Sequence, residues 1–514
     1  MDRLLVLLAA GAAPAYILAK LPLPERNPVL FLSVLSFAAA VFFWREPEVI
    51  VDASRYFTQA KHLELYGAGY FLREWGRDIS AWTDAPVIPF FYGLVFKYFG
   101  ESRLPIQVFT TLLFSSTVLL THMTGKALWN RETGFFAGVF LLGMPYLFSQ
   151  IPLMLVDLPS TALLMLSVYT FLMALERGRS WIAFAAAALF LAFFSKYSAW
   201  LMLSVLPVIL AVRVLRKEDT PEGAPRVYLS RGLAVAGIAL LLIGAFFLYK
   251  CDVFSGQIRL LMSYQKPGLK RWSESYVSTF LFQIHPFITA AAVYSAYAAF
   301  RKRDPRYLAA SWLALLIFAL QIKRIRYSLP AFPMFALLGA YGLCELKNSE
   351  LKKFIAFSVA VSSFTIALFA YLPFLETMNA VNITRAGEYL DSLNARDVEV
   401  FTLPPKDPAV NPAVAVPLLD LFTRKNIIYR YDRSSAPPAK QIEASPLRFT
   451  WEYKNPSYYS ASGKDANVLA TIGGPDDDVP RDVAQRMKDC RVKKTFDTTE
   501  NIFSSQTFVT VCLH

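Results

Sequence analysis

Two carboxylates and two basic groups stand where a reaction could use them together. Asp52 follows an apolar segment, and Asp157 begins another. Basic residues also interrupt two later apolar stretches: Lys196 at one, and Lys323, Arg324 and Arg326 at the other. A carboxylate can take a proton from an attacking hydroxyl, and Lys and Arg can stabilise a departing phosphate. This combination suits transfer of a group from a phosphate ester to a hydroxyl acceptor.

Each of these residues also has a purely structural explanation. Asp52 and Asp157 can cap the helices that they begin. The basic groups can extend toward lipid headgroups at the membrane surface. That second explanation accounts for one basic group more easily than for two. Cations between membrane helices are costly and usually mark a functional site.

The composition predicts the class of protein that contains these residues. The chain has 514 residues, of which 55% are hydrophobic and 18% are charged. Many uncharged windows reach the length of about 16–20 residues that spans a bilayer as a helix. We therefore predict an all-α polytopic membrane protein with about 11–12 transmembrane helices, estimated from the apolar segments. Those segments are 3–19, 28–44, 105–123, 134–149, 158–175, 181–195, 197–212, 231–250, 281–300, 307–322, 327–344 and 352–373.

The distribution of Lys and Arg predicts orientation. Several alternate connections are rich in Lys and Arg, including those around residues 177–179, 301–306 and 347–353. Such loops lie in the cytoplasm by the positive-inside rule. This placement also explains the formal net charge of +13 better than nucleic-acid binding does. The remaining connections, with Asp52, Asp157, Lys196 and the 323–326 group, then lie outside the membrane. We expect a multi-pass cell-membrane protein whose active site is extracytoplasmic.

Two segments lack spanning helices. Residues 45–100 are too polar to cross a bilayer, and we expect a first outer loop that covers the site, with Arg55, Tyr56 and Asp84 lining it. Residues 1–373 would form the catalytic membrane domain. In residues 374–514 charge and Pro rise, and helix-like and strand-like stretches alternate. This pattern predicts a soluble extracytoplasmic α/β domain.

We expect four strands and two helices in the C-terminal domain. The strands lie around 399–402, 426–431, 467–472 and 507–513, and the helices around 383–394 and 479–489. Cys490 and Cys512 could form a disulfide if this domain lies outside the cell, and two free thiols remain the alternative. Asn382-Ile-Thr384 is a glycosylation sequon, which is a weak signal because such tripeptides are common.

The order of these parts resembles the GT-C superfamily of lipid-phosphate-sugar glycosyltransferases. The branch that contains protein O-mannosyltransferases and lipid A aminoarabinose transferases is the most similar. Its motifs match residues 52–56 (Asp-Ala-Ser-Arg-Tyr), 84–100, 157–159 (Asp-Leu-Pro), 195–197 (Ser-Lys-Tyr) and 326–330 (Arg-Tyr-Ser-Leu-Pro). The resemblance covers roughly residues 28–345, and the order of the motifs is more specific than any one of them.

The resemblance implies a role for each candidate residue. Asp52 would be the catalytic base, with Asp157 supporting the site. The donor phosphate would be bound by the basic turns and an adjacent aromatic residue: Lys196, Lys323, Arg324, Arg326 and Tyr327. Two departures are clear: Ala53 stands where that branch often has an acid, and Asp84-Ala-Pro86 replaces the Lys-Pro-Pro of lipid A enzymes.

We therefore expect a membrane glycosyltransferase. It would move one sugar from a polyprenyl- or dolichyl-phosphate donor to a hydroxyl acceptor, which could be a protein, a glycan or a lipid. No nucleotide-binding motif is present, and no cofactor is expected, although Asp52 and Asp157 leave a divalent metal open. The alternative is a transporter or flippase of a lipid-linked or anionic solute. Repeated halves, which are common in transporters, are not evident in the sequence.

Overall fold

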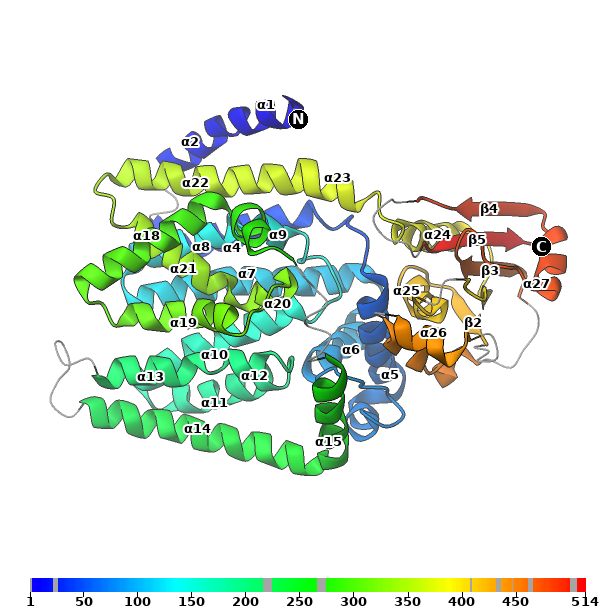
Figure 1. The fold of residues 1–514 in the computed structure, drawn as a ribbon, viewed down its shortest axis with the longest axis horizontal. Coiled ribbons are helices and arrows are strands. Elements are labelled where there is room, and N and C mark those ends of the chain that lie inside the picture. Colours follow the sequence, from blue (N-terminus) through cyan, green and yellow to red (C-terminus); the bar gives the residue numbers. More distant parts are fainter. Residues whose placement is uncertain are drawn as a thin grey trace.

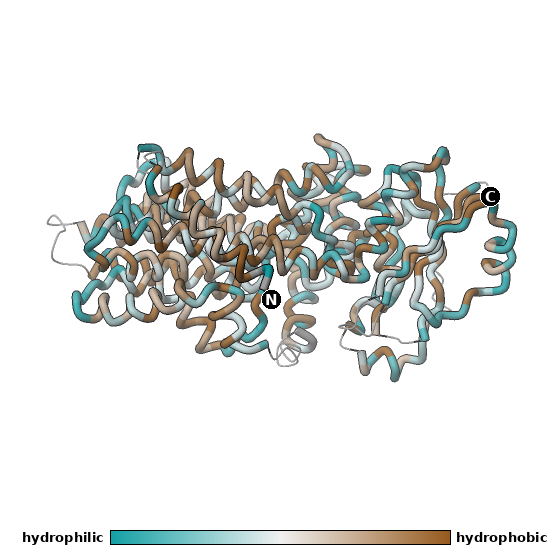
Figure 2. The backbone as a smooth tube through the Cα atoms, turned by 90° about the horizontal axis from the view of Figure 1, so that it is seen from above, coloured by the Kyte–Doolittle hydropathy of each residue, from teal (hydrophilic) through white to brown (hydrophobic). Residues whose placement is uncertain are grey.

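The computed structural model describes residues 2–21, 26–215, 224–265, 274–406, 409–430, 436–445, 447–460, 466–499 and 506–514. Helices stack side by side in one large part, and a smaller part at the other end holds the only sheet of the described residues (Figure 1). The hydrophobic residues concentrate in the helical part, whereas hydrophilic residues gather at its far end and over the smaller part (Figure 2). This distribution fits the predicted helical membrane protein with a C-terminal α/β domain.

The first half of the helical part runs from the N-terminus to the turn that carries Lys196. Its helices are α1 (Asp2–Ala10), α2 (Ala12–Lys20), α4 (Pro28–Val41), α5 (Ile50–Glu74), α6 (Val87–Phe99), α7 (Arg103–Leu128), α8 (Arg131–Leu142), α9 (Pro145–Phe148), α10 (Asp157–Arg177) and α11 (Ser180–Phe193). The helix α10 is buried along almost its whole length, so it forms the centre of the helical part.

The second half closes around α10. Its helices are α12 (Ala199–Met202), α13 (Val205–Leu215), α14 (Ala224–Tyr249), α15 (Cys251–Leu260), η1 (Leu261–Gln265), α17 (Tyr276–Ser278), η3 (Thr279–Ile284), α18 (Pro286–Lys302), α19 (Arg306–Ala319), α20 (Ile325–Ser328), η4 (Leu329–Ala331), α21 (Phe332–Leu343), α22 (Ser349–Ile366), η5 (Ala367–Tyr371) and α23 (Leu372–Leu375). The helix α22 runs along one edge of the stack toward the C-terminal domain (Figure 1).

Four helical stretches of the described residues are long and apolar enough to span a membrane by themselves. They are α7, α10, α14 and the stretch from α22 to α23, and shorter apolar helices accompany them. The predicted segment 281–300 is not a straight helix. The stretch Tyr276–Ile284 meets α18 at an angle of 110°, because His285 has a positive φ of 149° and Pro286 follows it.

Residues 45–100, which we expect to form the first outer loop over the site, are mostly helical. Most of the segment forms α5 and α6, which pack against each other between the helical stack and the sheet (Figure 1). Buried residues such as Tyr56, Ala60 and Leu63 recur every three or four positions, which gives α5 one apolar face. Gly93 permits the close approach of α6, since a Cβ there would lie 2.6 Å from the Leu63 Cβ.

The C-terminal domain contains a five-stranded mixed sheet. The strand order is β2-β1-β3-β5-β4, with β1 parallel to β2 and β3, and β5 antiparallel to β3 and β4. The strands are β1 (Asp397–Thr402), β2 (Asn426–Tyr429), β3 (Val468–Gly473), β4 (Val492–Phe496) and β5 (Phe508–Leu513). The helices around it are α24 (Val381–Ser392), η6 (Pro412–Ala415), α25 (Val416–Leu421), α26 (Ala439–Ala444), η8 (Arg448–Glu452), η9 (Ser457–Tyr459) and α27 (Arg481–Lys488).

The four strands and two helices expected in this domain are all present, and β4 is an addition. Cys490 and Cys512 form a disulfide between the start of β4 and the end of β5. The sequon residue Asn382 is fully buried. Its amide group donates to the carbonyl oxygens of Thr498 and Thr507, each at 3.0 Å. Asn382 therefore ties α24 to the ends of β4 and β5 rather than facing solvent.

One ionic junction joins α5 to the C-terminal domain. The Lys61 ammonium of α5 lies 2.6 Å from a carboxylate oxygen of Asp420 in α25 and 2.8 Å from one of Glu101. The Tyr459 hydroxyl donates to the same Asp420 oxygen at 2.8 Å. Because all of these side chains are largely buried, the junction fixes the domain against the helix that begins near Asp52.

Candidate active site

The two predicted catalytic carboxylates share one guanidinium group. Arg326 Nη1 lies 2.5 Å from Asp52 Oδ2, and Arg326 Nε lies 2.6 Å from Asp157 Oδ2. Lys196 Nζ donates to the other oxygen of Asp157. The structure therefore brings together four residues that lie far apart in the sequence.

Local structure explains how each of these four side chains is presented. Asp52 lies in the first turn of α5, and Asp157 is the first residue of α10. A carboxylate is favourable at a helix N-terminus because of the helix dipole. Lys196 lies in the break between α11 and α12, and Arg326 lies in the one-turn helix α20 before Pro330. All four thus lie where a helix begins or is interrupted.

A second branch extends from Asp52 through the predicted lining residues. Arg55 Nη1 lies 3.6 Å from Asp52 Oδ1, and Arg55 Nη2 pairs with Asp84. Gln59 Nε2 donates to Asp84 Oδ2 at 3.0 Å. The ring of Tyr56 is buried, and its centre is 5.9 Å from Arg55 Cζ. Arg55, Tyr56 and Asp84 therefore adjoin Asp52, as the sequence predicts.

The remaining predicted phosphate-binding residues differ in their positions. The Tyr327 ring lies beneath two cations, 4.9 Å from Lys196 Nζ and 5.2 Å from Arg324 Cζ. Arg324 also donates to the Tyr327 hydroxyl at 3.3 Å. Lys323 is exposed, and no contact among the described residues joins it to Asp52 or Asp157. Among the predicted phosphate-binding residues, Lys323 thus lies at the edge.

Opposite charges in this group are nearly balanced. The carboxylates of Asp52, Asp84 and Asp157 face the cations of Arg55, Lys196 and Arg326. Burial alone would raise the pKa of the Asp52 carboxyl. The guanidinium groups of Arg326 and Arg55 outweigh burial and hold this pKa well below its usual range. Asp52 is therefore ionised, as a general base must be before it accepts a proton.

Arg326 also bears on the question of a metal. It places a positive charge between Asp52 and Asp157, which is where a divalent ion shared by these carboxylates would lie. In the part of the chain that the structure describes, no three His, Cys, Asp or Glu side chains are grouped as metal ligands. Metal binding by this pair would require Arg326 to move.

Comparison with known proteins shows which proteins share the fold that carries this site. Residues 83–244, which include Asp84, Asp157 and Lys196, match the family dolichyl-phosphate-mannose-protein mannosyltransferase. The crystal structure of ArnT from Cupriavidus metallidurans bound to undecaprenyl phosphate matches with a TM-score of 0.61 at 12% identity, covering 96% of this chain and 98% of that chain. The chain has the fold of the GT-C glycosyltransferases.

Two more solved structures support the same fold. ArnT from Cupriavidus metallidurans in the apo state has a TM-score of 0.58 at 12% identity and covers 93% of this chain and 97% of its own. The oligosaccharyltransferase AglB from Archaeoglobus fulgidus, in complex with an inhibitory peptide and a dolichol-phosphate, has a TM-score of 0.50 at 10% identity. That match covers 87% of this chain and 70% of AglB. No curated protein matches this chain by sequence.

Sequence reasoning missed a residue that supports the Asp157 turn. Glu48 Oε2 accepts a hydrogen bond from the backbone N–H of Met154 at 2.9 Å, and Glu48 Oε1 lies 3.1 Å from Arg103 Nε. Glu48 is almost completely buried. A Glu only four residues before Asp52 is a signal that could have been used, but its partner segment could not be deduced from spacing.

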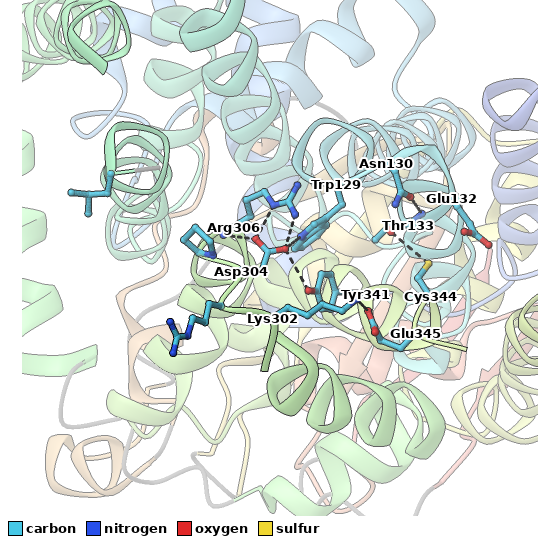
Figure 3. Close-up of a pocket in the computed structure, with 13 residues that line it drawn as sticks. Trp129, Asn130, Glu132, Thr133, Lys302, Asp304, Arg306, Tyr341, Cys344 and Glu345 are labelled. Carbon is cyan, nitrogen blue, oxygen red and sulfur yellow. Dashed lines mark hydrogen bonds and ion pairs between the residues drawn. The ribbon is translucent and has the colours of Figure 1, made fainter. Parts of the chain in front are cut away.

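A cavity lies at the ends of the helices opposite to Asp157 and Arg326. It has a volume of about 590 Å³ and is lined by the ends of α7, α18 and α21 and the starts of α8 and α19 (Figure 3). Asp304 lies at its centre and accepts from Arg306, Trp129 and Tyr341. Because its acidic and basic side chains are paired with one another, this cavity does not favour one charge of ligand.

Proposed function

We propose that this chain is a membrane glycosyltransferase that moves a single sugar from a polyprenyl- or dolichyl-phosphate carrier to a hydroxyl acceptor, with inversion. Asp52 is the general base, and Lys196 and Arg326 bind the donor phosphate. The observation that carries the proposal is the Arg326 guanidinium shared by Asp52 and Asp157. The GT-C fold, and the lipid phosphates named for ArnT and AglB, support this donor class. The site and the C-terminal domain would face away from the cytoplasm.

The bonds and charges of this reaction assign a task to each side chain. The acceptor oxygen attacks the anomeric carbon, and its proton passes to the Asp52 carboxylate. The bond between the anomeric carbon and the phosphate oxygen breaks, and the lipid phosphate leaves with an additional negative charge. Arg326 and Lys196 therefore bind the phosphate more strongly as the bond breaks, which lowers the barrier to transfer.

The ion pairs of this site would change when the donor binds. Arg326 and Lys196 now neutralise Asp52 and Asp157. A phosphate that draws these cations away would remove the main influence that keeps the Asp52 pKa low. The base would then become a stronger proton acceptor only when the donor is present. This coupling between donor binding and the pKa of Asp52 would limit hydrolysis of the donor by water.

The test is release of lipid phosphate and formation of product from a labelled lipid-phosphate sugar, using the full chain in lipid vesicles. Asp52→Asn should lower the rate by about 100-fold or more, which is the range for a lost general base. Asp252→Asn is the matched control, because Asp252 of α15 forms an exposed ion pair with Arg77, which follows α5. Full activity of the Asp52 variant would remove the mechanism. Movement of the intact donor across the vesicle would instead support the transporter alternative.

The phosphate-binding residues need a separate measurement. Lys196→Ala and Arg326→Ala should lower kcat/KM for the donor by about 10- to 150-fold, the value of one charge-assisted hydrogen bond. Arg326→Lys keeps the charge and should be less severe. An unchanged dependence on donor concentration in these variants would show that the two residues do not bind the phosphate.

A further inference from the structure

A short element of the C-terminal domain reaches the group around Asp52. The ring of Phe449 in η8 stacks on Trp82, with 4.6 Å between ring centres and 28° between planes. Trp82 Nε1 donates to Glu452 Oε2, in the same element, at 2.7 Å. Trp82 is thus held at its ring face and at its N–H by η8. Its φ of 42° is rare for a residue with a side chain, so this position depends on its surroundings.

Arg55 lies against this aromatic pair. Its Cζ atom is 5.2 Å from the Trp82 ring centre and 5.6 Å from the Phe449 ring centre. Both distances are within the range of a cation–π interaction. The side chain of Arg55 is only 21% exposed, so the rings also shield it from water. A long Arg side chain has many conformations, and contacts on its face restrict them.

The same Arg55 contacts the proposed base on its other side. Its two terminal nitrogens reach Asp52 and Asp84, and Gln257 Nε2 donates to the Asp84 carbonyl oxygen at 3.1 Å. A continuous chain of contacts therefore leads from Phe449 through Arg55 to the Asp52 carboxylate. Each contact in this chain joins side chains rather than backbone, so a single substitution can interrupt it.

We infer that Phe449 is a positioning residue, by which the C-terminal domain holds Arg55 and through it Asp52 in the orientation for proton transfer. The inference rests on the proposed function, and it adds that the domain belongs to the catalytic machinery. If the domain moved away, Arg55 would lose one ring face and the support of Trp82. The base would then be less well oriented, and it would lose part of the positive charge that keeps it ionised.

The test compares Phe449→Leu, which keeps an apolar side chain but removes the ring, with Phe449→Tyr, which keeps the ring. We expect Phe449→Leu to lower kcat about 10-fold while the donor KM stays within twofold. The acid limb of the pH–rate profile should move to higher pH by about half a unit to one unit, since a cation near a carboxylate is worth roughly that much. Phe449→Tyr should restore both values.

Two controls separate positioning from general damage. Phe401→Leu removes a ring that lies 5.4 Å from Arg486 inside the same domain, and it should leave kcat and the pH profile unchanged. Phe449→Leu should have little further effect in an Arg55→Met background if Phe449 acts through Arg55. Additive losses of kcat in the double variant would overturn the inference, as would a wild-type kcat and pH profile in Phe449→Leu.

A readout without turnover distinguishes this inference from the proposed function. The wild type, Phe449→Leu, Arg55→Met and the double variant form a double-mutant cycle whose readout is the midpoint of thermal unfolding. This cycle should show coupling between Arg55 and Phe449 even if Asp52→Asn proved active. Absence of coupling would overturn the inference while leaving the proposed function intact. If Phe449→Leu did not fold, Glu452→Gln would serve instead. This change weakens the hydrogen bond that Glu452 accepts from Trp82 Nε1, and it should shift the acid limb of the pH–rate profile in the same direction.

Discussion

Raising the pH from 4 to 8 should weaken the junction between α5 and the C-terminal domain. Burial raises the pKa of Asp420 to about 6 and that of Glu101 to about 7, although the Lys61 ammonium partly opposes both shifts. Tyr459 and Tyr458 also face Asp420, and Glu64 faces Glu101. Because two carboxyl groups share the Lys61 ammonium and a third faces Glu101, the junction favours a bound proton when the domain is packed on α5.

The size of the loss in stability follows from the difference in pKa between two states. In the closed state the C-terminal domain packs on α5, and in the separated state it does not. The ordinary pKa is 3.8 for an Asp such as Asp420 and 4.5 for a Glu such as Glu101, so each pKa rises by roughly two or more. At about 1.4 kcal/mol for each unit, either group alone accounts for roughly 3 kcal/mol. The two effects do not simply add, because both groups contact Lys61. The closed state binds more protons than the separated state between about pH 4 and pH 7, so its stability falls as the pH rises through this window.

The assay is thermal unfolding of the full chain in lipid nanodiscs between pH 4 and pH 8, together with the rate at which a protease releases the C-terminal domain. Asp420→Asn should flatten the pH dependence, because the amide does not ionise and can still accept from Tyr459. Asp397→Asn is the matched control, since Asp397 lies at the start of β1 and accepts from Asn426. A midpoint that is constant or rises toward pH 8, or a slope as steep in Asp420→Asn as in the wild type, would refute the reasoning.

Three further predictions concern packing, positioning and the disulfide. Gly93→Ala should lower the free energy of unfolding by about 1–3 kcal/mol, since its methyl group would lie 2.6 Å from the Leu63 Cβ; an unchanged denaturation midpoint would contradict this. Glu48→Gln should lower kcat and thermal stability together, because it weakens a charged acceptor for the Met154 N–H, worth about 1.5–3 kcal/mol; steady-state kinetics and calorimetry can check both. Cys490→Ser should destabilise the C-terminal domain by about 3 kcal/mol, measured by proteolysis, since it opens a crosslink across 22 residues; equal protease resistance would count against it.

The meeting of Asp52, Asp157, Lys196 and Arg326 was predictable from the sequence. A bilayer limits where polar residues can lie, so charges at the ends of apolar segments must gather in one of two surface layers. The alternation of basic loops then assigns each charge to a layer. This reasoning brings residues far apart in the chain to the same side, although it does not specify that Arg326 bridges the two carboxylates.

Other features could not be predicted because their signals are weak or depend on the packing of one part against another. The full length of α5 was hidden by its polar residues and by Gly67, which interrupts it. The strand β4 is mostly exposed and lacks the apolar alternation that marks a strand. The contacts of Phe449 with Trp82 depend on how the C-terminal domain packs against α5, and no periodicity encodes that arrangement.

The burial of Asn382 has a consequence for production of the protein in cells that attach glycans. Its amide nitrogen, the atom that a glycan would occupy, bonds to the carbonyl oxygens that flank β4 and β5. An attached oligosaccharide is therefore incompatible with the buried position of Asn382 between α24 and these strands. Any carbohydrate found at this asparagine would identify molecules modified before α24 packed against β4 and β5, and α24 would be displaced in such molecules.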